Sequence, residues 1–141
     1  MIAAIVVLYH PDQEAVERLL SSLIGQVNTV FAIDNTPGST PTRLAFLDAF
    51  GEPVSYVPLG ENRGIAEAQN IGIELSMKGG YSHVLLLDQD STLSPGLSRV
   101  EKLTRRFARR SQRGSCIFER ECYSGFRTKP RGSCPKMLVL L

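Results

Sequence analysis

The sequence contains no hydrophobic run long enough to cross a membrane, which takes about 20 apolar residues. Its apolar start, residues 2–8, has no positively charged segment before it and no small-residue cleavage site after it, so it does not resemble a signal peptide. We therefore expect no membrane span and a cytoplasmic protein. This location is compatible with peripheral association at the inner face of the cell membrane.

Cysteine is absent from the first 103 residues, and the three cysteines present are Cys116, Cys122 and Cys134. They form no CxxC pair and have no histidine nearby, so they give only weak support for a zinc site. A disulfide is not expected in the cytosol. The sequence also has no GxGxxG after its first apolar segment, which argues against a Rossmann dehydrogenase.

Charge is divided unevenly, although the net charge is only +2. Residues 1–103 contain six basic and twelve acidic residues, whereas residues 104–141 contain ten basic and two acidic residues. No set of aromatic residues accompanies the basic run at 105–113, so we do not expect nucleic acid as a partner. We divide the chain into a folded part, residues 1–103, and a basic, cysteine-containing tail, residues 104–141.

Short apolar segments alternate with amphipathic ones in the first part of the chain. The expected strands lie at residues 2–9, 29–34, 53–59 and 83–88. Helical spacing of apolar residues predicts helices between them, at 13–24, 41–50 and 65–78. For the second helix, we expect Thr40 as N-cap and Pro41 as the first helical residue. This alternation predicts an α/β fold with a mainly parallel, Rossmann-like sheet and flanking helices.

Three of the expected strands end in polar residues: Tyr9-His10, Asp34-Asn35 and Asp88-Gln89-Asp90. In parallel sheets ligands bind beyond the carboxyl ends of the strands, so these residues would converge on one site. Two carboxylates as close as Asp88 and Asp90 repel each other unless a cation lies nearby. Mg²⁺ or Mn²⁺ bound to a diphosphate would remove that repulsion. The alternative is that one acid caps a following helix and the other is solvated.

Four stretches, VVLYHPD, VFAIDNTPGS, PLGENRGIAEAQNIGI and HVLLLDQDSTLSPG, occur in this order within residues 1–103. Together they resemble the nucleotide-sugar-binding half of family 2 glycosyltransferases, which have the GT-A fold. Their sequences are most similar to those of the bacterial rhamnosyltransferases of that family, which use dTDP-rhamnose. The resemblance implies transfer of a sugar from a nucleoside diphosphate donor to a saccharide acceptor in cell-surface polysaccharide synthesis.

The resemblance also implies a donor site in this chain. Tyr9 would border the base, and Asp34 would accept a hydrogen bond from the pyrimidine. Asn62, Gly64 and Asn70 would shape the wall beside the nucleotide. A solvent-facing position is the alternative for Asn70.

At the other end of the implied site, Asp88 would reach the ribose side, and Asp90 would bind Mg²⁺ or Mn²⁺ at the diphosphate. An inverting transfer also needs a general base for the acceptor hydroxyl. In the family this base comes from the second half of the domain, so no catalytic residue is assigned here.

Two other functions are weighed against this one. VLLLDQDSTL also matches the first motif of haloacid-dehalogenase-like phosphatases, in which Asp88 would be the nucleophile and Asp90 the acid/base with Mg²⁺. In that family, however, the motif lies at the first strand, whereas here it lies at the fourth. The other alternative is a non-catalytic nucleotide-sugar binder.

The tail motivates this last alternative, because the resemblance stops near residue 103. Residues 104–141 have no clear amphipathic period, and their composition suggests a frameshifted reading or disorder. A truncated, inactive fragment of a transferase is therefore part of the expectation.

Overall fold

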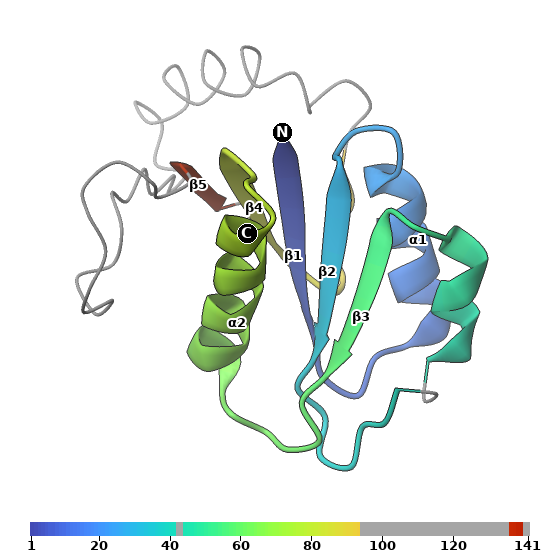
Figure 1. The fold of residues 1–141 in the computed structure, drawn as a ribbon. Helices are drawn as coiled ribbons and strands as arrows, with labels where there is room; N and C mark the ends of the chain where they lie inside the picture. The colour runs from blue at the N-terminus through green and yellow to red at the C-terminus, as the bar shows by residue number, and fades with distance from the viewer. Residues whose placement is uncertain (42–43, 94–135, 140–141) are drawn as a thin grey trace, which may run out of the picture.

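The computed structural model describes residues 1–41, 44–93 and 136–139. Its strands form one sheet in the order β3-β2-β1-β4-β5 (Figure 1). All described pairings are parallel, which confirms the expected α/β class with a parallel sheet. The strands are β1 (Ile2–Leu8), β2 (Thr29–Asp34), β3 (Val54–Pro58), β4 (His83–Asp88) and β5 (Lys136–Val139).

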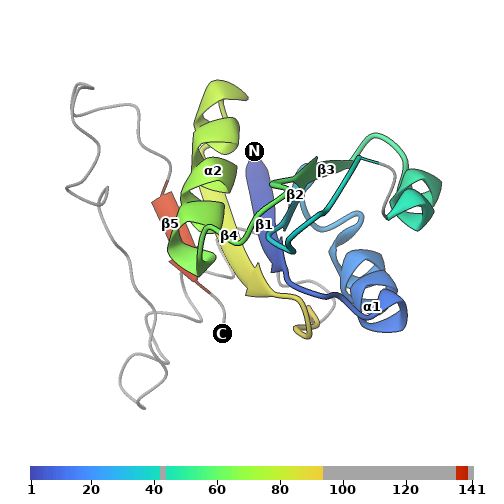
Figure 2. The same ribbon diagram turned by 90° about the horizontal axis from the view of Figure 1, so that it is seen from below.

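Helices cover both faces of the sheet (Figures 1 and 2). Helix α1 (Gln13–Leu23) and the 3₁₀ helix η1 (Ala45–Phe50) lie on one face, and α2 (Ile65–Lys78) lies on the other. Helix α1 begins where predicted, because Oδ1 of Asp12 accepts a 2.9 Å hydrogen bond from the Ala15 amide. Within the described ranges, no helix is long and apolar enough to cross a membrane.

Alternation along the strands sorts the core into two clusters, because successive side chains point to opposite faces. In β1, Ala4 and Val6 pack with the α1 side, whereas Ile5 packs with the α2 side. The same parity holds in β4, where Leu85 and Leu86 belong to different clusters. The parity of a strand residue, meaning whether its position along the strand is odd or even, therefore determines which helix layer it faces.

The prediction of a helix starting at Pro41 is wrong. The helix in this region is η1, which begins at Ala45. The preceding loop is tied to the turn after β3, since Gly38 donates to the Gly60 carbonyl and Ser39 Oγ accepts from the Gly60 amide, at 2.8 and 3.0 Å. These bonds hold the segment before η1 as a loop.

The boundary at residue 103 stays a prediction. Of the tail, residues 104–141, only the strand β5 is described, and the rest lies outside the described residues. The backbone of β5 pairs in parallel with β4, from His83↔Lys136 to Leu86↔Val139.

Candidate functional site

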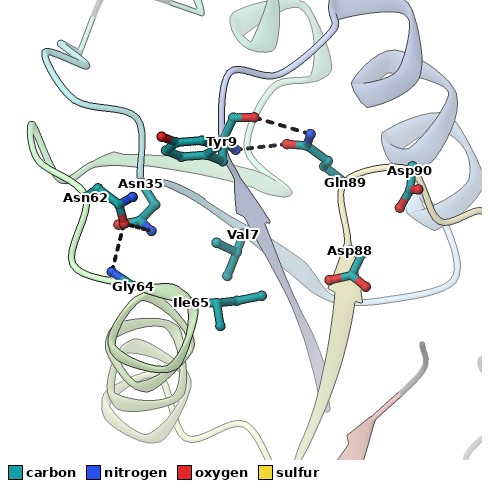
Figure 3. A pocket seen from close by; sticks show the side chains of 9 residues that line it. All are labelled: Val7, Tyr9, Asn35, Asn62, Gly64, Ile65, Asp88, Gln89 and Asp90. Atoms are coloured by element: carbon teal, nitrogen blue, oxygen red, sulfur yellow. Dashed lines mark hydrogen bonds between the residues drawn. The ribbon is translucent and has the colours of Figure 1, made fainter.

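A cavity of about 470 Å³ opens beyond the carboxyl ends of β1 and β4 (Figure 3). From β1 the chain moves outward to β2 and β3, then crosses by α2 to the other side of β1 and forms β4. The strand order reverses between β1 and β4, and such a switch point leaves a crevice where ligands bind. The lining residues come from the ends of β1, β2 and β4 and from the start of α2: Val7, Tyr9, Asn35, Asn62, Gly64, Ile65, Asp88, Gln89 and Asp90.

Two carboxylates line one side of this cavity. Asp88 is the last residue of β4 and half-buried, and Asp90 is exposed in the following turn. Among the described residues, neither carboxylate has a hydrogen bond or an ion pair, and no cluster of three or more His, Cys, Asp or Glu side chains occurs. Two carboxylates nevertheless fit Mg²⁺, which usually takes its other ligands from water and phosphate oxygens.

Between the two acids, Gln89 turns its side chain to β1. Its Oε1 accepts a 2.8 Å hydrogen bond from the Tyr9 amide, and its Nε2 donates to the Tyr9 carbonyl at 3.3 Å. The dashed lines in Figure 3 mark both bonds. The two sides of the cavity mouth are therefore joined directly.

The opposite wall is a loop held by amide side chains. Asn35, buried after β2, accepts from the Arg63 amide at 2.8 Å and donates to Oδ1 of Asn62 at 3.0 Å. The same Oδ1 accepts from the Gly64 amide at 2.9 Å. Gly64 has φ of 80°, a conformation that glycine adopts without strain, so the chain can turn into α2 here.

The cavity also has an apolar part formed by Val7, Tyr9 and Ile65. Tyr9 and Ile65 are 46% and 56% exposed, and they belong to the few large hydrophobic side chains on the described surface. Exposed apolar surface that gathers in a polar-rimmed hollow is typical of a binding site.

Asp34 lies outside this lining, although sequence reasoning placed it in the site. Its carboxylate is fully buried, and it accepts hydrogen bonds from the Thr36 amide at 2.9 Å and from the Tyr56 hydroxyl at 2.7 Å. In β2, Asp34 has the parity of Val30 and Ala32, which face α1. The cavity is on the α2 side, so the next residue, Asn35, lines it instead.

The predicted site residues therefore divide into two groups. Those that the structure brings together around the cavity are Tyr9, Asn62, Gly64, Asp88 and Asp90. Asp34 and Asn70 are not in the lining, and Asn70 is half-buried within α2.

Sequence reasoning assigned no individual role to four lining residues, Val7, Asn35, Ile65 and Gln89. Asn35 and Gln89 are among the polar residues at strand ends expected to converge on one site, but the sequence indicates no particular contact for either. Val7 and Ile65 give no signal of a site, because apolar residues are expected in a strand and a helix.

The sequence of this chain is similar to that of glycosyl transferases. The sequence model described as Glycosyl transferase family 2 matches residues 4–136. The dTDP-rhamnosyl transferase RfbF of Shigella flexneri is 37% identical over 93 residues, which cover 65% of this chain and 30% of that protein. The chain thus spans about 30% of the length of this curated relative. In the crystal structure of S. aureus TarS, 23% of the chain aligns with 92% of this one, at a TM-score of 0.49 and 17% identity.

Proposed function

Because the chain belongs to glycosyl transferase family 2, we propose that its cavity binds the nucleoside diphosphate part of a sugar donor. One observation carries this proposal: an acidic pair, Asp88 and Asp90, shares a cavity with the apolar surfaces of Tyr9 and Ile65. A nucleoside diphosphate has both matching parts, a flat base for the apolar surface and a diphosphate that brings a divalent cation to carboxylates.

In this proposal Tyr9 borders the base, and Asn62 and Gly64 form the wall beside the nucleotide. Asp88 is directed to the ribose side, and Asp90 holds the cation at the diphosphate. The position of Asp34 does not support the predicted pyrimidine contact, because its buried carboxylate already accepts two hydrogen bonds. The lining likewise gives no support for a wall role of Asn70.

The proposed cation is Mg²⁺ or Mn²⁺. When bound, it would act as a Lewis acid that neutralises charge on the departing nucleoside diphosphate. Asp90 is suited to hold it because its carboxylate is exposed at the cavity and has no partner among the described residues. The Asn35–Asn62 pair fixes the facing wall, so the ligand would meet a preformed surface.

We propose dTDP-rhamnose as the donor and a saccharide as the acceptor, in cell-surface polysaccharide synthesis. The similarity to a protein described as a dTDP-rhamnosyl transferase supports this choice. Residues 1–103 would form the donor-binding part, in the cytoplasm or at the inner face of the membrane. Family membership does not favour the phosphatase alternative.

Calorimetric titration of the full chain with dTDP tests the proposal. In a buffer with Mn²⁺ we expect saturable binding of dTDP. In a buffer with EDTA and no added Mn²⁺, the dissociation constant should be at least about tenfold higher. Thymidine, which lacks the diphosphate, should show no dependence on Mn²⁺. An absence of saturable dTDP binding at millimolar concentration in both buffers would contradict the proposal.

A further inference from the structure

The side chain of Gln89 continues the pairing of β1 with β4 beyond the point where the backbones separate. The backbone ladder ends at Val7↔Asp88. After Asp88 the chain turns, and the Ser91 amide donates to the Asp88 carbonyl at 3.1 Å. Tyr9, two residues after Val7 and just beyond the end of β1, still forms two hydrogen bonds, and both partners are atoms of the Gln89 side chain.

A glutamine side chain can do this because its primary amide has the donor and the acceptor of a peptide group. It satisfies the Tyr9 amide and carbonyl while its own backbone turns to present Asp90 at the cavity. In Figure 3 the side chain spans from the chain between Asp88 and Asp90 to the backbone of Tyr9. Two bonds with opposite donor directions also fix the orientation of the amide, which one bond would not.

We propose that Gln89 is a positioning residue that sets the distance between Tyr9, which belongs to the apolar wall of the cavity (Val7, Tyr9 and Ile65), and the acids Asp88 and Asp90. This inference rests on the proposed function. A nucleoside diphosphate must contact the wall and the acids at once, so a spacing fixed in advance lowers the ordering cost of binding. Without this fixed spacing, the apolar wall could still contact the nucleoside and the acids could still bind the cation. The affinity for a ligand that contacts both at once would be lower.

The test compares Gln89→Met with the wild-type full chain. Methionine keeps the length of the side chain and removes both hydrogen bonds. Gln13→Met is the matched control, because Gln13 is exposed on α1 and, within the part of the chain that the structure describes, its side chain donates only to Glu17, at 2.7 Å. Dissociation constants for dTDP are measured in Mn²⁺ and in EDTA, and hydrogen exchange of the Tyr9 amide is measured without ligand.

For Gln89→Met we expect about tenfold weaker dTDP binding in Mn²⁺, a change within about twofold in EDTA, and faster exchange at Tyr9. Gln13→Met should change none of these. Equal weakening in both buffers, or no weakening in either, would overturn the inference while leaving the proposed function intact. If wild-type protein binds no dTDP in either buffer, both fail.

Discussion

The Tyr56 hydroxyl donates a 2.7 Å hydrogen bond to the buried carboxylate of Asp34, which joins the edge strand β3 to the end of β2. The other carboxylate oxygen accepts from the Thr36 amide, and the Thr36 hydroxyl accepts from the His10 amide at 2.9 Å. A series of hydrogen bonds therefore runs from β3 to the loop after β1. This loop begins at Tyr9, so the hydrogen bond between Tyr56 and the buried Asp34 helps to hold the Tyr9 side of the cavity in place.

Replacing Tyr56 by phenylalanine should lower the free energy of unfolding by about 1.5–3 kcal/mol, because a buried carboxylate loses a hydrogen bond. Urea denaturation measures this change. Tyr81→Phe is the control, because phenylalanine keeps the edge-on contact with Phe31, in which the ring centroids are 6.2 Å apart. This substitution should change the free energy of unfolding by less than about 0.5 kcal/mol. Equal effects of the two substitutions would show that the Asp34 bond contributes nothing specific.

Gly72→Ala should be destabilising, although alanine favours helices over glycine. A Cβ at Gly72 would lie 2.5 Å from Cγ2 of Ile5, because α2 packs closely on β1. We expect a loss of about 1–3 kcal/mol from overpacking, measured by urea or thermal denaturation. Adding Ile5→Ala removes the clashing atoms, so the Gly72→Ala penalty should shrink in that background. A stabilising Gly72→Ala would mean that the helix lies farther from the sheet.

Asp90→Asn should abolish most of the effect of Mn²⁺ on dTDP binding, because a neutral amide is a weaker ligand for a hard cation than a carboxylate. The dissociation constant in Mn²⁺ should rise about tenfold, to near the value in EDTA. Asp48→Asn, which changes an exposed acid on η1, serves as the control for net charge. If both substitutions weaken binding equally, the effect is one of overall charge and Asp90 holds no cation.

Ile65→Ser should weaken dTDP binding by about tenfold and leave stability nearly unchanged, because the side chain is 56% exposed at the cavity. The matched control is Ile24→Ser, at the end of α1, where the isoleucine is 39% exposed and lies outside the cavity lining. Titration of each variant with dTDP measures the affinity, and a thermal melt of each variant measures the stability. Unchanged binding in Ile65→Ser would remove the apolar wall from the proposed site.

The strands of residues 1–93 could be predicted closely from the sequence, because a parallel sheet buried on both faces needs continuous apolar runs. The run at 83–88, for example, is β4. The start of η1 could not be predicted in this way. Thr40 and Pro41 have good local chemistry for a helix start, but the contacts of Gly38 and Ser39 with Gly60 join segments about 20 residues apart, beyond the reach of local propensity.

The sequence indicates where in the fold the candidate site lies better than it indicates which residues line it. Polar residues at strand ends identify the edge of the sheet, but the direction of each side chain depends on parity and register. Asp34 and Asn35 are neighbours in the sequence and point to opposite layers, so only one lines the cavity. The proposed role of Gln89 depends on a contact with Tyr9, which is 80 residues away in the sequence, and no local pattern reveals that contact.

This separation along the chain also affects how the cavity forms during synthesis. Strand β1 can pair with β2 once residues 29–34 have left the ribosome, but its other edge waits for residues 83–88. At roughly 5–20 residues per second, that edge stays open for several seconds. The bonds between Gln89 and Tyr9 cannot form before residue 89 has been synthesised, so the nascent chain completes the cavity only after β4 docks.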